Sequence, residues 1–500
     1  MSYDYVVVGG GTAGSVLAAR LSQDPDVRVL LVEAGGASPP SQSGNPPDWP
    51  RLLHGTADWG VPTTVQTATG TSMHLGRGRG IGGSSVINAM VFARGHRDSY
   101  ADWSQFGAVG WSFDDLLPYL MRSETAPHGD PDHRGRTGPL RVAPASSPHP
   151  VLSAGLSAAE QVGYRRATDV SSGLEIGFGP TDLTIADRRR ISAADAYLIP
   201  ALSRPNLEVV TEALVHRVLL AGGRALGVEY RDRTGEVVQQ YATREVVVSA
   251  GGIGSPQLLM LSGIGAADQL RSMGIDVVAN LPAVGANLQD HALTGLVYRA
   301  AQPLPPAQNN HGEVLGLIQT TGDAGAPDLQ IILVDSATVI GLDAPDTYLV
   351  GFSAIQPFSR GTVRLAGPEP DLAPVVDPNY LADERDMRTM LHGLSVAREI
   401  GAAPALDGWR GAEISPGPTT TDETALREYI KATASSYFHP VGTCALGETD
   451  QAVVDSALRV RGVTGLRVVD ASVMPSLPSN NPLATVYGIA ERGAELLLAS

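Results

Sequence analysis

The fold is decided by residues 4–36, which read DYVVVGGGTAGSVLAARLSQDPDVRVLLVEAGG. An apolar run at residues 5–8 leads into Gly9, Gly11 and Gly14, and a helical pattern follows until residues 24–25, Asp-Pro. A second apolar run then ends at Glu33. The order strand, glycine turn, helix, strand predicts a βαβ unit, and the glycines have the G-x-G-x-x-G spacing of dinucleotide-binding folds.

Each residue of this pattern has a physical task in binding a dinucleotide. Gly9 makes the tight turn, Gly11 lets a pyrophosphate approach the backbone, and Gly14 lets the helix pack closely on the strand. Glu33 stands where a carboxylate accepts a hydrogen bond from a ribose 2′-hydroxyl. An acid at this position disfavours the 2′-phosphate of NADP, so NAD and FAD remain the alternatives.

Two further glycine-rich segments follow along the chain. Residues 76–88 read GRGRGIGGSSVIN, and the apolar residues 89–93 after them favour a buried ligand contact over a surface loop. A strand at 245–249 leads into Ala-Gly-Gly-Ile-Gly at 250–254. There Ser255 is expected to cap a helix that has Pro256 at its first position.

Strand-like runs at 207–210 and 214–220 precede the strand at 245–249, so nucleotide-binding architecture resumes here, and a helical pattern at 484–498 closes the chain. The segment from about 290 to 435 predicts a second kind of architecture, with strand-like runs at 329–334, 348–352 and 361–365 and helical patterns at 383–399 and 421–431. We therefore expect an α/β fold (α+β overall), in which a Rossmann-like domain is interleaved with a substrate domain built on a mainly antiparallel sheet backed by helices. The expected dinucleotide domain comprises residues 1–150, 200–288 and 440–500, and the expected substrate domain comprises residues 151–199 and 289–439.

Composition limits the classes of function. The 500 residues carry 36 basic and 52 acidic side chains, a net charge of −16, without a block of Lys and Arg, so neither a nucleic acid nor a membrane surface is an expected partner. The single cysteine, Cys444, fits a reducing compartment. Since we recognise no leader and no apolar stretch of ~18 residues, we expect a cytoplasmic protein. His128 and His133, with two acids between them, lack a metal-binding framework, so no metal is expected.

Three segments near the C-terminus complete the pattern: SYFHPVGTC at 436–444, LRVVDASVMP at 466–475 and SNNP at 479–482. Together with the N-terminal glycines and Glu33, the segment Gly82–Asn88 and the segment Gly251–Pro256, they follow the order of motifs in one family. The sequence resembles the glucose–methanol–choline (GMC) oxidoreductases, FAD-dependent alcohol oxidases and dehydrogenases, from residue 5 to residue 492.

The resemblance implies specific roles. His439 matches the active-site histidine that faces the flavin, and Asn481 matches its partner, with Asn480 as the alternative because the usual Asn-x-Asn-x-Pro pattern is altered here. Tyr437 and Phe438 are candidates for the wall of the substrate pocket. The implied cofactor-binding residues are Gly9, Gly11, Thr12, Ala13, Gly14, Glu33, Ala34, Gly82, Ser84, Asn88, Ala89, Val215, Ala250, Gly251, Asp470, Ala471 and Pro482.

The implied reaction oxidises the CH–OH group of a small alcohol to an aldehyde or ketone. The hydride goes to flavin N5, His439 takes the hydroxyl proton, and Asn481 holds the same oxygen. FAD is expected to be non-covalent, since no histidine occupies the Gly82–Asn88 segment where some relatives attach it. Few charges surround the C-terminal motifs, which favours a neutral alcohol over a quaternary amine. Whether O2 or another acceptor reoxidises the flavin, and the oligomeric state, stay open.

Three alternatives remain at this stage. A NAD-linked dehydrogenase explains the first sixty residues but leaves the later motifs without a role. A hydroxynitrile lyase of the same architecture would keep FAD without a redox step. A flavin-binding carrier or photoreceptor would make His439 incidental.

Overall fold

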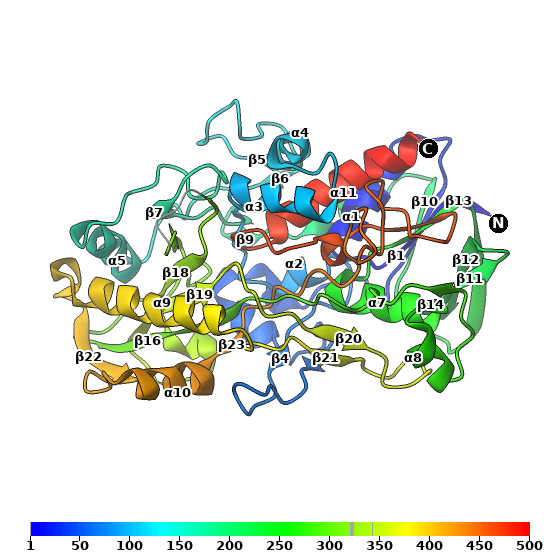
Figure 1. The fold of residues 1–500 in the computed structure, drawn as a ribbon. Helices are drawn as coiled ribbons and strands as arrows, with labels where there is room; N and C mark the ends of the chain where they lie inside the picture. The colour runs from blue at the N-terminus through cyan, green and yellow to red at the C-terminus, as the bar shows by residue number, and fades with distance from the viewer. Residues whose placement is uncertain (1, 321–324, 343) are drawn as a thin grey trace.

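The computed structural model describes residues 2–320, 325–342 and 344–500. The sheet at the end of the molecule that carries both termini has a parallel part of five strands (Figure 1). In spatial order these are β10 (Leu207–Val210), β2 (Val29–Val32), β1 (Tyr3–Val8), β13 (Val237–Val248) and β24 (Leu466–Val468). β1, β2 and the last three residues of β13 read as short apolar runs because they are buried on both faces, whereas β10 at the edge exposes Glu208.

Strand β13 belongs to both the parallel and the antiparallel part of this sheet. Its last residues pair in parallel with β1 and β24, whereas its first residues pair antiparallel with β12 (Arg224–Arg231), which in turn pairs with β11 (Leu214–Ala221). The first part of β13 alternates between exposed and half-buried residues, and its last three are buried. The first part of the strand therefore lies in the antiparallel part of the sheet, near solvent, and its end lies in the core.

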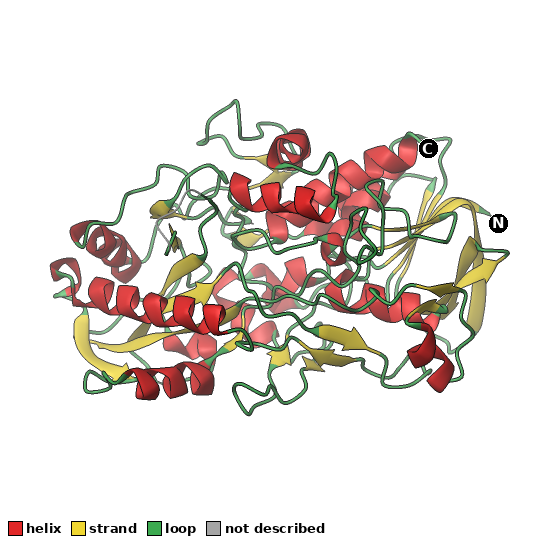
Figure 2. Ribbon diagram, viewed as in Figure 1, coloured by secondary structure: helices red, strands yellow, loops and turns green. Residues whose placement is uncertain are grey.

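The second sheet lies at the other end of the molecule and is antiparallel throughout (Figures 1 and 2). Its order is β22 (Arg410–Ser415), β16 (Ala292–Ala300), β19 (Thr347–Ala354), β18 (Leu329–Val334), β17 (Val314–Ile318) and β7 (Gly177–Pro180), with β23 (Ser435–Ser436) on β16. The strands predicted at 329–334 and 348–352 are thus present, and so is the mainly antiparallel sheet.

Helices cover both sheets. In the first, α1 (Thr12–Leu21) packs between β1 and α11 (Leu483–Leu498), and α11 also contacts α4 (Phe113–Ser123). In the second, α9 (Glu384–Ala402) packs on β19 and β18 and contacts α5 (Pro150–Gln161) and α10 (Glu423–Thr433). The helices predicted at 383–399, 421–431 and 484–498 correspond to α9, α10 and α11. The α/β fold with two different sheets is confirmed; the domain limits stay a prediction.

One local prediction was wrong, and another was right about the strand but not about the sheet that contains it. The helix expected to begin after Ser255 is α7 (Gly251–Leu261), which begins five residues earlier, with Ala250 as its N-cap. Ser255 lies inside the helix, where its hydroxyl accepts from the N–H of Ala250 (3.0 Å) and donates to Asp470 (2.5 Å). The strand expected at 361–365 is β20 (Thr362–Arg364), and it pairs only with β21 (Val375–Asp377), outside the large sheet.

Shorter elements connect these parts. The helices are α2 (Ser84–Ile87), α3 (Arg97–Ala101), α6 (Ile199–Ala201), α8 (Ala267–Ser272), η1 (Ser41–Gly44), η2 (Pro46–Leu52), η3 (Asp102–Phe106), η4 (Ala194–Leu198), η5 (Ala337–Ile340), η6 (Pro404–Leu406) and η7 (Ala471–Val473). The strands pair as β3 (Val61–Pro62) with β4 (His74–Leu75), β5 (Glu124–Thr125) with β6 (Leu140–Arg141), β8 (Ile185–Ala186) with β9 (Arg189–Arg190), and β14 (Ile264–Gly265) with β15 (Ala279–Asn280). Within the described residues, no helix combines the length and the apolar character that crossing a membrane requires.

Candidate active site

A cavity of about 1160 Å³ is lined by residues of both sheets, among them Val8 and Val215 of the first and Leu293 and Ile332 of the second. Sites for single small molecules occupy ~300–1,000 Å³. The cavity is therefore large enough to hold a dinucleotide together with a second, smaller molecule.

The glycine turn forms one end of this cavity. Gly9 has φ +98°, which a side chain rarely adopts, and a Cβ at Gly14 would lie 1.8 Å from the Gly9 carbonyl oxygen. Gly11 instead faces the cavity, where the nearest atom to an added Cβ, at 3.9 Å, is the Cα of Gly83. Thr12 and Ala13 also line the cavity, so the N-terminus of α1 points into it. This geometry fits the pyrophosphate of a dinucleotide.

The buried carboxylates of Glu33 and Asp470 differ in how many lone pairs remain free to accept a hydrogen bond from a ligand. Glu33 accepts from the backbone N–H groups of Gly10 (2.6 Å), Gly35 (2.8 Å) and Gly80 (2.9 Å). A carboxylate has about four lone-pair sites, so one on Oε2 remains for a ribose hydroxyl. Burial raises the pKa of Glu33, and these three donors oppose the shift.

Asp470 has no such capacity left. Its Oδ2 accepts from the Gly251 N–H (2.8 Å) and the Ser255 hydroxyl (2.5 Å), and its Oδ1 accepts from the N–H (2.8 Å) and hydroxyl (2.5 Å) of Ser472. All four lone-pair sites are thus engaged by the protein. Although Asp470 lines the cavity, its carboxylate acts by holding the start of α7 against the 470–472 turn.

Most of the residues predicted to bind the cofactor line this cavity. They are Gly9, Gly11, Thr12, Ala13, Glu33, Ala34, Ser84, Asn88, Ala89, Val215, Ala250, Gly251, Asp470, Ala471 and Pro482. Gly14 and Gly82 do not line it. Gly14 lets α1 pack on the β1 turn, and a Cβ at Gly82 would meet Val86 Cγ2 at 2.8 Å, so both glycines act through packing.

Backbone pairing between distant segments builds the other end of the cavity. The strand pair β16–β23 continues past its ends, since the N–H of Tyr437 donates to the His291 carbonyl (2.9 Å), and Gln289 and Val441 exchange backbone hydrogen bonds. This register brings the side chain of His291 next to that of His439.

Hydrogen bonds then fix the tautomer of His439. His291 Nε2 lies 3.0 Å from the Ile355 carbonyl oxygen, which can only accept, so the Nε2–H of His291 donates. The Nδ1 of a neutral His291 is therefore an acceptor, and it lies 2.9 Å from Nδ1 of His439. His439 must carry its proton on Nδ1. Its Nε2 then has a free lone pair, 3.2 Å from the Asn481 amide nitrogen.

The protonation states agree with this chain of hydrogen bonds. Burial lowers the pKa of His291 to about 3, against the opposing effect of the Ile355 carbonyl. Burial also lowers the pKa of His439 well below its ordinary value, and His291 and Arg77 add to this effect. Both imidazoles are therefore neutral near pH 7, and His439 Nε2 can accept a proton.

The two asparagines differ in their surroundings. Asn480 donates to the Arg94 carbonyl (3.2 Å) and accepts from Gln330 (2.9 Å). Its side chain is therefore hydrogen-bonded to groups other than His439. Asn481 lines the cavity, and its Oδ1 lies 3.4 Å from Gln330 Nε2, which orients the amide nitrogen toward His439. The geometry favours Asn481 as the partner of His439.

The walls around these polar groups are apolar. Leu293, Ile332, Val334 and Leu349 line the cavity from neighbouring strands of the second sheet, and Tyr437 and Phe438 also line it. The carboxylates that line the cavity are Glu33, Glu212, Asp232, Asp371 and Asp470, and none of them lies on a strand of the second sheet.

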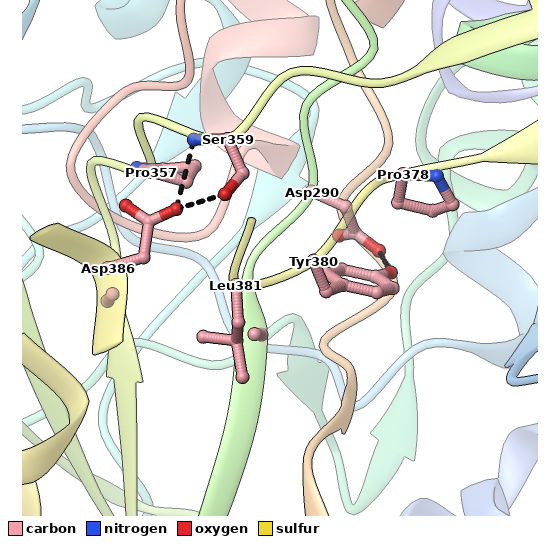
Figure 3. A pocket seen from close by; sticks show the side chains of 9 residues that line it. Asp290, Pro357, Ser359, Pro378, Tyr380, Leu381 and Asp386 are labelled. Atoms are coloured by element: carbon pink, nitrogen blue, oxygen red, sulfur yellow. Dashed lines mark hydrogen bonds between the residues drawn. The ribbon is translucent and has the colours of Figure 1, made fainter. Parts of the chain in front are cut away.

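Sequence reasoning missed His291 and its neighbour Asp290. The buried carboxylate of Asp290 accepts from the backbone N–H of His439 (2.7 Å), from the hydroxyl of Ser436 (2.5 Å) and from the hydroxyl of Tyr380, which points toward it in Figure 3. On the far side of Asp290 is a small cavity of about 10 Å³, where Asp386 binds the backbone and hydroxyl of Ser359 (Figure 3). The polar residues 289–291, Gln-Asp-His, directly before a strand were the available signal.

The structure also places acids beside His128. His128 Nε2 lies 2.9 Å from Asp182, and Asp169 is close enough to complete a set of three potential metal ligands. The buried guanidinium of Arg134, however, binds both Asp169 (2.6 Å) and Asp182. The cluster is therefore an ion-pair network centred on an arginine, while His133 binds Asp130 separately (3.0 Å).

Comparison with known proteins identifies the family. The N-terminal and C-terminal sequence models described as GMC oxidoreductase match residues 3–293 and 357–490. The chain belongs to the GMC oxidoreductases. It is 40% identical to mitochondrial choline dehydrogenase of Homo sapiens, across 99% of this chain and 89% of that protein.

Two solved structures are similar over their whole length. Pyridoxine 4-oxidase from Mesorbium loti has a TM-score of 0.94 and 37% identity, covering 99% of each chain. An FAD-dependent oxidoreductase from Chaetomium thermophilum has a TM-score of 0.92 and 26% identity, covering 100% of this chain and 99% of that one. The protein is accordingly an FAD-dependent oxidoreductase that acts on CH–OH groups. Because these relatives are dehydrogenases and oxidases, they give the hydroxynitrile lyase alternative no support.

Proposed function

We propose that this protein oxidises a small neutral alcohol to an aldehyde or ketone, with His439 as the base and Asn481 as the hydrogen-bond donor to the substrate oxygen. One observation carries the proposal: the Nε2 lone pair of a neutral His439 lies next to the Asn481 amide, at the apolar end of the cavity. When bound, FAD supplies the acceptor for the hydride that leaves the carbinol carbon.

The side chains perform the proton half of the reaction. A substrate hydroxyl that replaces Asn481 as the donor to Nε2 transfers its proton there, and the Asn481 amide is then free to donate to the substrate oxygen. As negative charge develops on that oxygen, the amide stabilises it. The Nδ1–H of His439 stays bound to His291, so the ring keeps its orientation while it carries the proton.

The proposed substrate class rests on the lining carboxylates. A cationic alcohol is stabilised by a carboxylate or by aromatic rings near it. Tyr437 and Phe438 are aromatic lining residues, but no lining carboxylate lies on a described strand of the second sheet. Although the human relative is a choline dehydrogenase, we propose that choline is a poor substrate here and that aryl, furanic, pyridine-type or aliphatic alcohols are better.

For the cofactor we propose non-covalent FAD, with Glu33 bound to its ribose and the N-terminus of α1 at its pyrophosphate. The lone-pair site left on Glu33 and the cavity-facing Thr12 and Ala13 support this arrangement. Acid precipitation tests it, because non-covalent FAD stays in the supernatant. We also retain a cytoplasmic location as a proposal, supported by the single, buried cysteine.

The proposed reaction is tested by mixing the purified protein anaerobically with benzyl alcohol, furfuryl alcohol, 3-pyridinemethanol, 1-hexanol and choline, and recording flavin absorbance. We expect one or more of the neutral alcohols to bleach the flavin, and choline to do so least. Admitting air then separates the acceptors, since rapid recovery with peroxide identifies an oxidase. Flavin that stays oxidised with every neutral alcohol would contradict the proposal.

A further inference from the structure

The glycine-rich segment at residues 76–88 contributes a charged side chain to the His439 end of the cavity. Arg77 follows β4 by two residues, is half-buried and lines the cavity. Its Nη2 donates to the backbone carbonyl of Phe438 (2.5 Å), and its Nε donates to the carbonyl of Gly76 (2.5 Å). A guanidinium keeps its charge in proteins. The carbonyl oxygen of the Phe438–His439 peptide therefore accepts a hydrogen bond from a cation.

The N–H of the same peptide donates to an anion. Asp290 Oδ1 accepts from the His439 N–H (2.7 Å). The other three lone-pair sites of Asp290 accept from the N–H of His291 (2.9 Å) and from the hydroxyls of Ser436 and Tyr380 (Figure 3). Burial raises the pKa of Asp290, but four donors on four lone-pair sites leave no place for a proton, so the group is a carboxylate. Opposite charges thus bind the two polar atoms of the peptide that leads into His439.

The backbone needs support at this point. Phe438 has φ +65°, in the left-handed region that a bulky side chain rarely adopts. Such a conformation costs ~1–3 kcal/mol and persists only where the surrounding contacts over-determine it. Here the Phe438 N–H donates to the Ser436 hydroxyl (2.8 Å), and Arg77 and Asp290 bind the peptide that follows. Without the bond from Arg77 we expect Phe438 to relax and the ring of His439 to move with it.

We propose that Arg77 is a positioning residue for the oxidation: it holds the Phe438–His439 peptide opposite Asp290 and so keeps His439 Nε2 beside the Asn481 amide. The inference rests on the proposed alcohol oxidation. Proton transfer from the substrate hydroxyl to Nε2 requires the two atoms to meet at hydrogen-bond distance, and a misplacement of about 1 Å costs ~10²-fold in rate. Arg77 itself neither gives nor takes the transferred proton.

The charge of Arg77 provides a second readout, which a purely structural role would not move. Burial lowers the pKa of His439, and His291 and the positive charge of Arg77 add to this effect. The other titratable groups around the ring keep one state near neutral pH. Burial lowers the pKa of His291 to about 3 and raises that of the Tyr437 phenol, whose ring centroid lies 4.5 Å from that of His439, and Asp290 is ionised. Removing the Arg77 charge should therefore raise the pKa of His439, so the acid limb of the rate profile moves to higher pH.

The test compares Arg77→Met, Arg77→Lys and Arg427→Met in the FAD-loaded protein. Arg77→Met removes both hydrogen bonds and the charge, whereas Arg77→Lys keeps the charge and a donor. Arg427→Met is the control: it removes a positive charge from α10, where Arg427 pairs with the exposed Glu384 (2.7 Å) and Glu423 (2.8 Å) and does not line the cavity. Anaerobic stopped-flow with benzyl alcohol, furfuryl alcohol, 3-pyridinemethanol and 1-hexanol gives the limiting rate of flavin reduction and its pH dependence for each alcohol that reduces the wild type.

The three variants have different expected results. Arg77→Met should lower the limiting rate by roughly 10- to 100-fold and move the acid limb up by at least about 0.5 pH unit. Arg77→Lys should lose less of the rate and keep the acid limb of the wild type. Arg427→Met should stay within about twofold of the wild type.

The contrary outcomes are distinguishable from one another. If none of these alcohols reduces the wild type, the proposed function fails and this inference with it. If the wild type is reduced and Arg77→Met is equally fast, only the role of Arg77 fails. Equal losses in Arg77→Met and Arg77→Lys with an unmoved acid limb would show that Arg77 only fills space. Should both variants lose their flavin or melt more than about 5 °C lower, Arg77 serves the fold.

Discussion

His439 is proposed to act as a neutral base. Replacing it should slow proton transfer without changing the binding of FAD. A positioned base contributes ~10²–10⁴ in rate, so His439→Ala should reduce its flavin at least about a hundredfold more slowly while its FAD content is unchanged. Anaerobic stopped-flow measures the rate, and the flavin spectrum provides the control. A variant that is reduced at the wild-type rate would show that another group takes the proton.

The pH dependence of kcat/KM reports the protonation state of His439. Burial lowers the pKa of His439 from an ordinary value of 6.5, so the neutral base persists below pH 6.5 and is lost only as the pH falls through the lowered pKa. We therefore expect kcat/KM to be flat across neutral pH, with its acid limb below pH 6.5. An acid limb centred above pH 7 would mean that substrate or cofactor raises the pKa of His439.

His291 acts through His439, and two substitutions of similar size isolate its effect. In His291→Leu the Nδ1–H of His439 loses its acceptor, which costs ~1–3 kcal/mol, or roughly 5- to 150-fold in rate. In His291→Asn a side-chain carbonyl is available to accept, and we expect part of the rate to return. The rate of flavin reduction and the acid limb of the pH profile measure both variants; equal losses would show that His291 only fills space.

At the residue scale, motifs that are local in sequence predicted which residues line the cavity. His439 and Asn481 belong to short segments and both line it, while their roles stay a prediction. The contact between His291 and His439 spans 148 residues and depends on the register of β16 against β23. No pattern within either segment encodes that register. The contact of His291 with His439 could therefore be recognised only from the three-dimensional structure.

At the scale of elements, the packing of α1 on the β1 turn leads to a matched pair of substitutions. Gly14→Ala places a Cβ 1.8 Å from the Gly9 carbonyl oxygen, whereas Gly36→Ala has no atom within 4 Å to meet. Overpacking costs ~1–3 kcal/mol or more, so Gly14→Ala should weaken FAD binding and lower the melting temperature. Gly36→Ala should change neither. Flavin fluorescence titration and thermal melts check both variants, and a normal Gly14→Ala protein would mean that α1 can shift.

The bounds of the helices show which local sequence signals predict an element correctly and which do not. Periodicity placed α9 and α10 to within a few residues, because each packs one face against the rest of the protein, and α11 was placed as well although residues 484–491 of it are buried all round. It placed the start of α7 five residues too late, since the Ser255–Pro256 pair lies inside this helix, where the Ser255 hydroxyl accepts from the Ala250 N–H and donates to Asp470. A Ser-Pro pair alone therefore does not mark the first residue of a helix.

For the whole molecule, residues of both sheets line the cavity, so we expect bound FAD to couple the stability of the two sheets. A ligand that binds only the folded state stabilises it by ~2.7 kcal/mol at a hundred times its Kd, and FAD has potential contacts on both sheets. We expect FAD-free protein to melt at a lower temperature, and added FAD to restore the loss. ADP, which lacks the flavin, reaches only the end with Glu33 and α1, so it should restore less. Calorimetric scans of the three samples measure this, and equal restoration by ADP and FAD would show that the flavin end adds no coupling between the sheets.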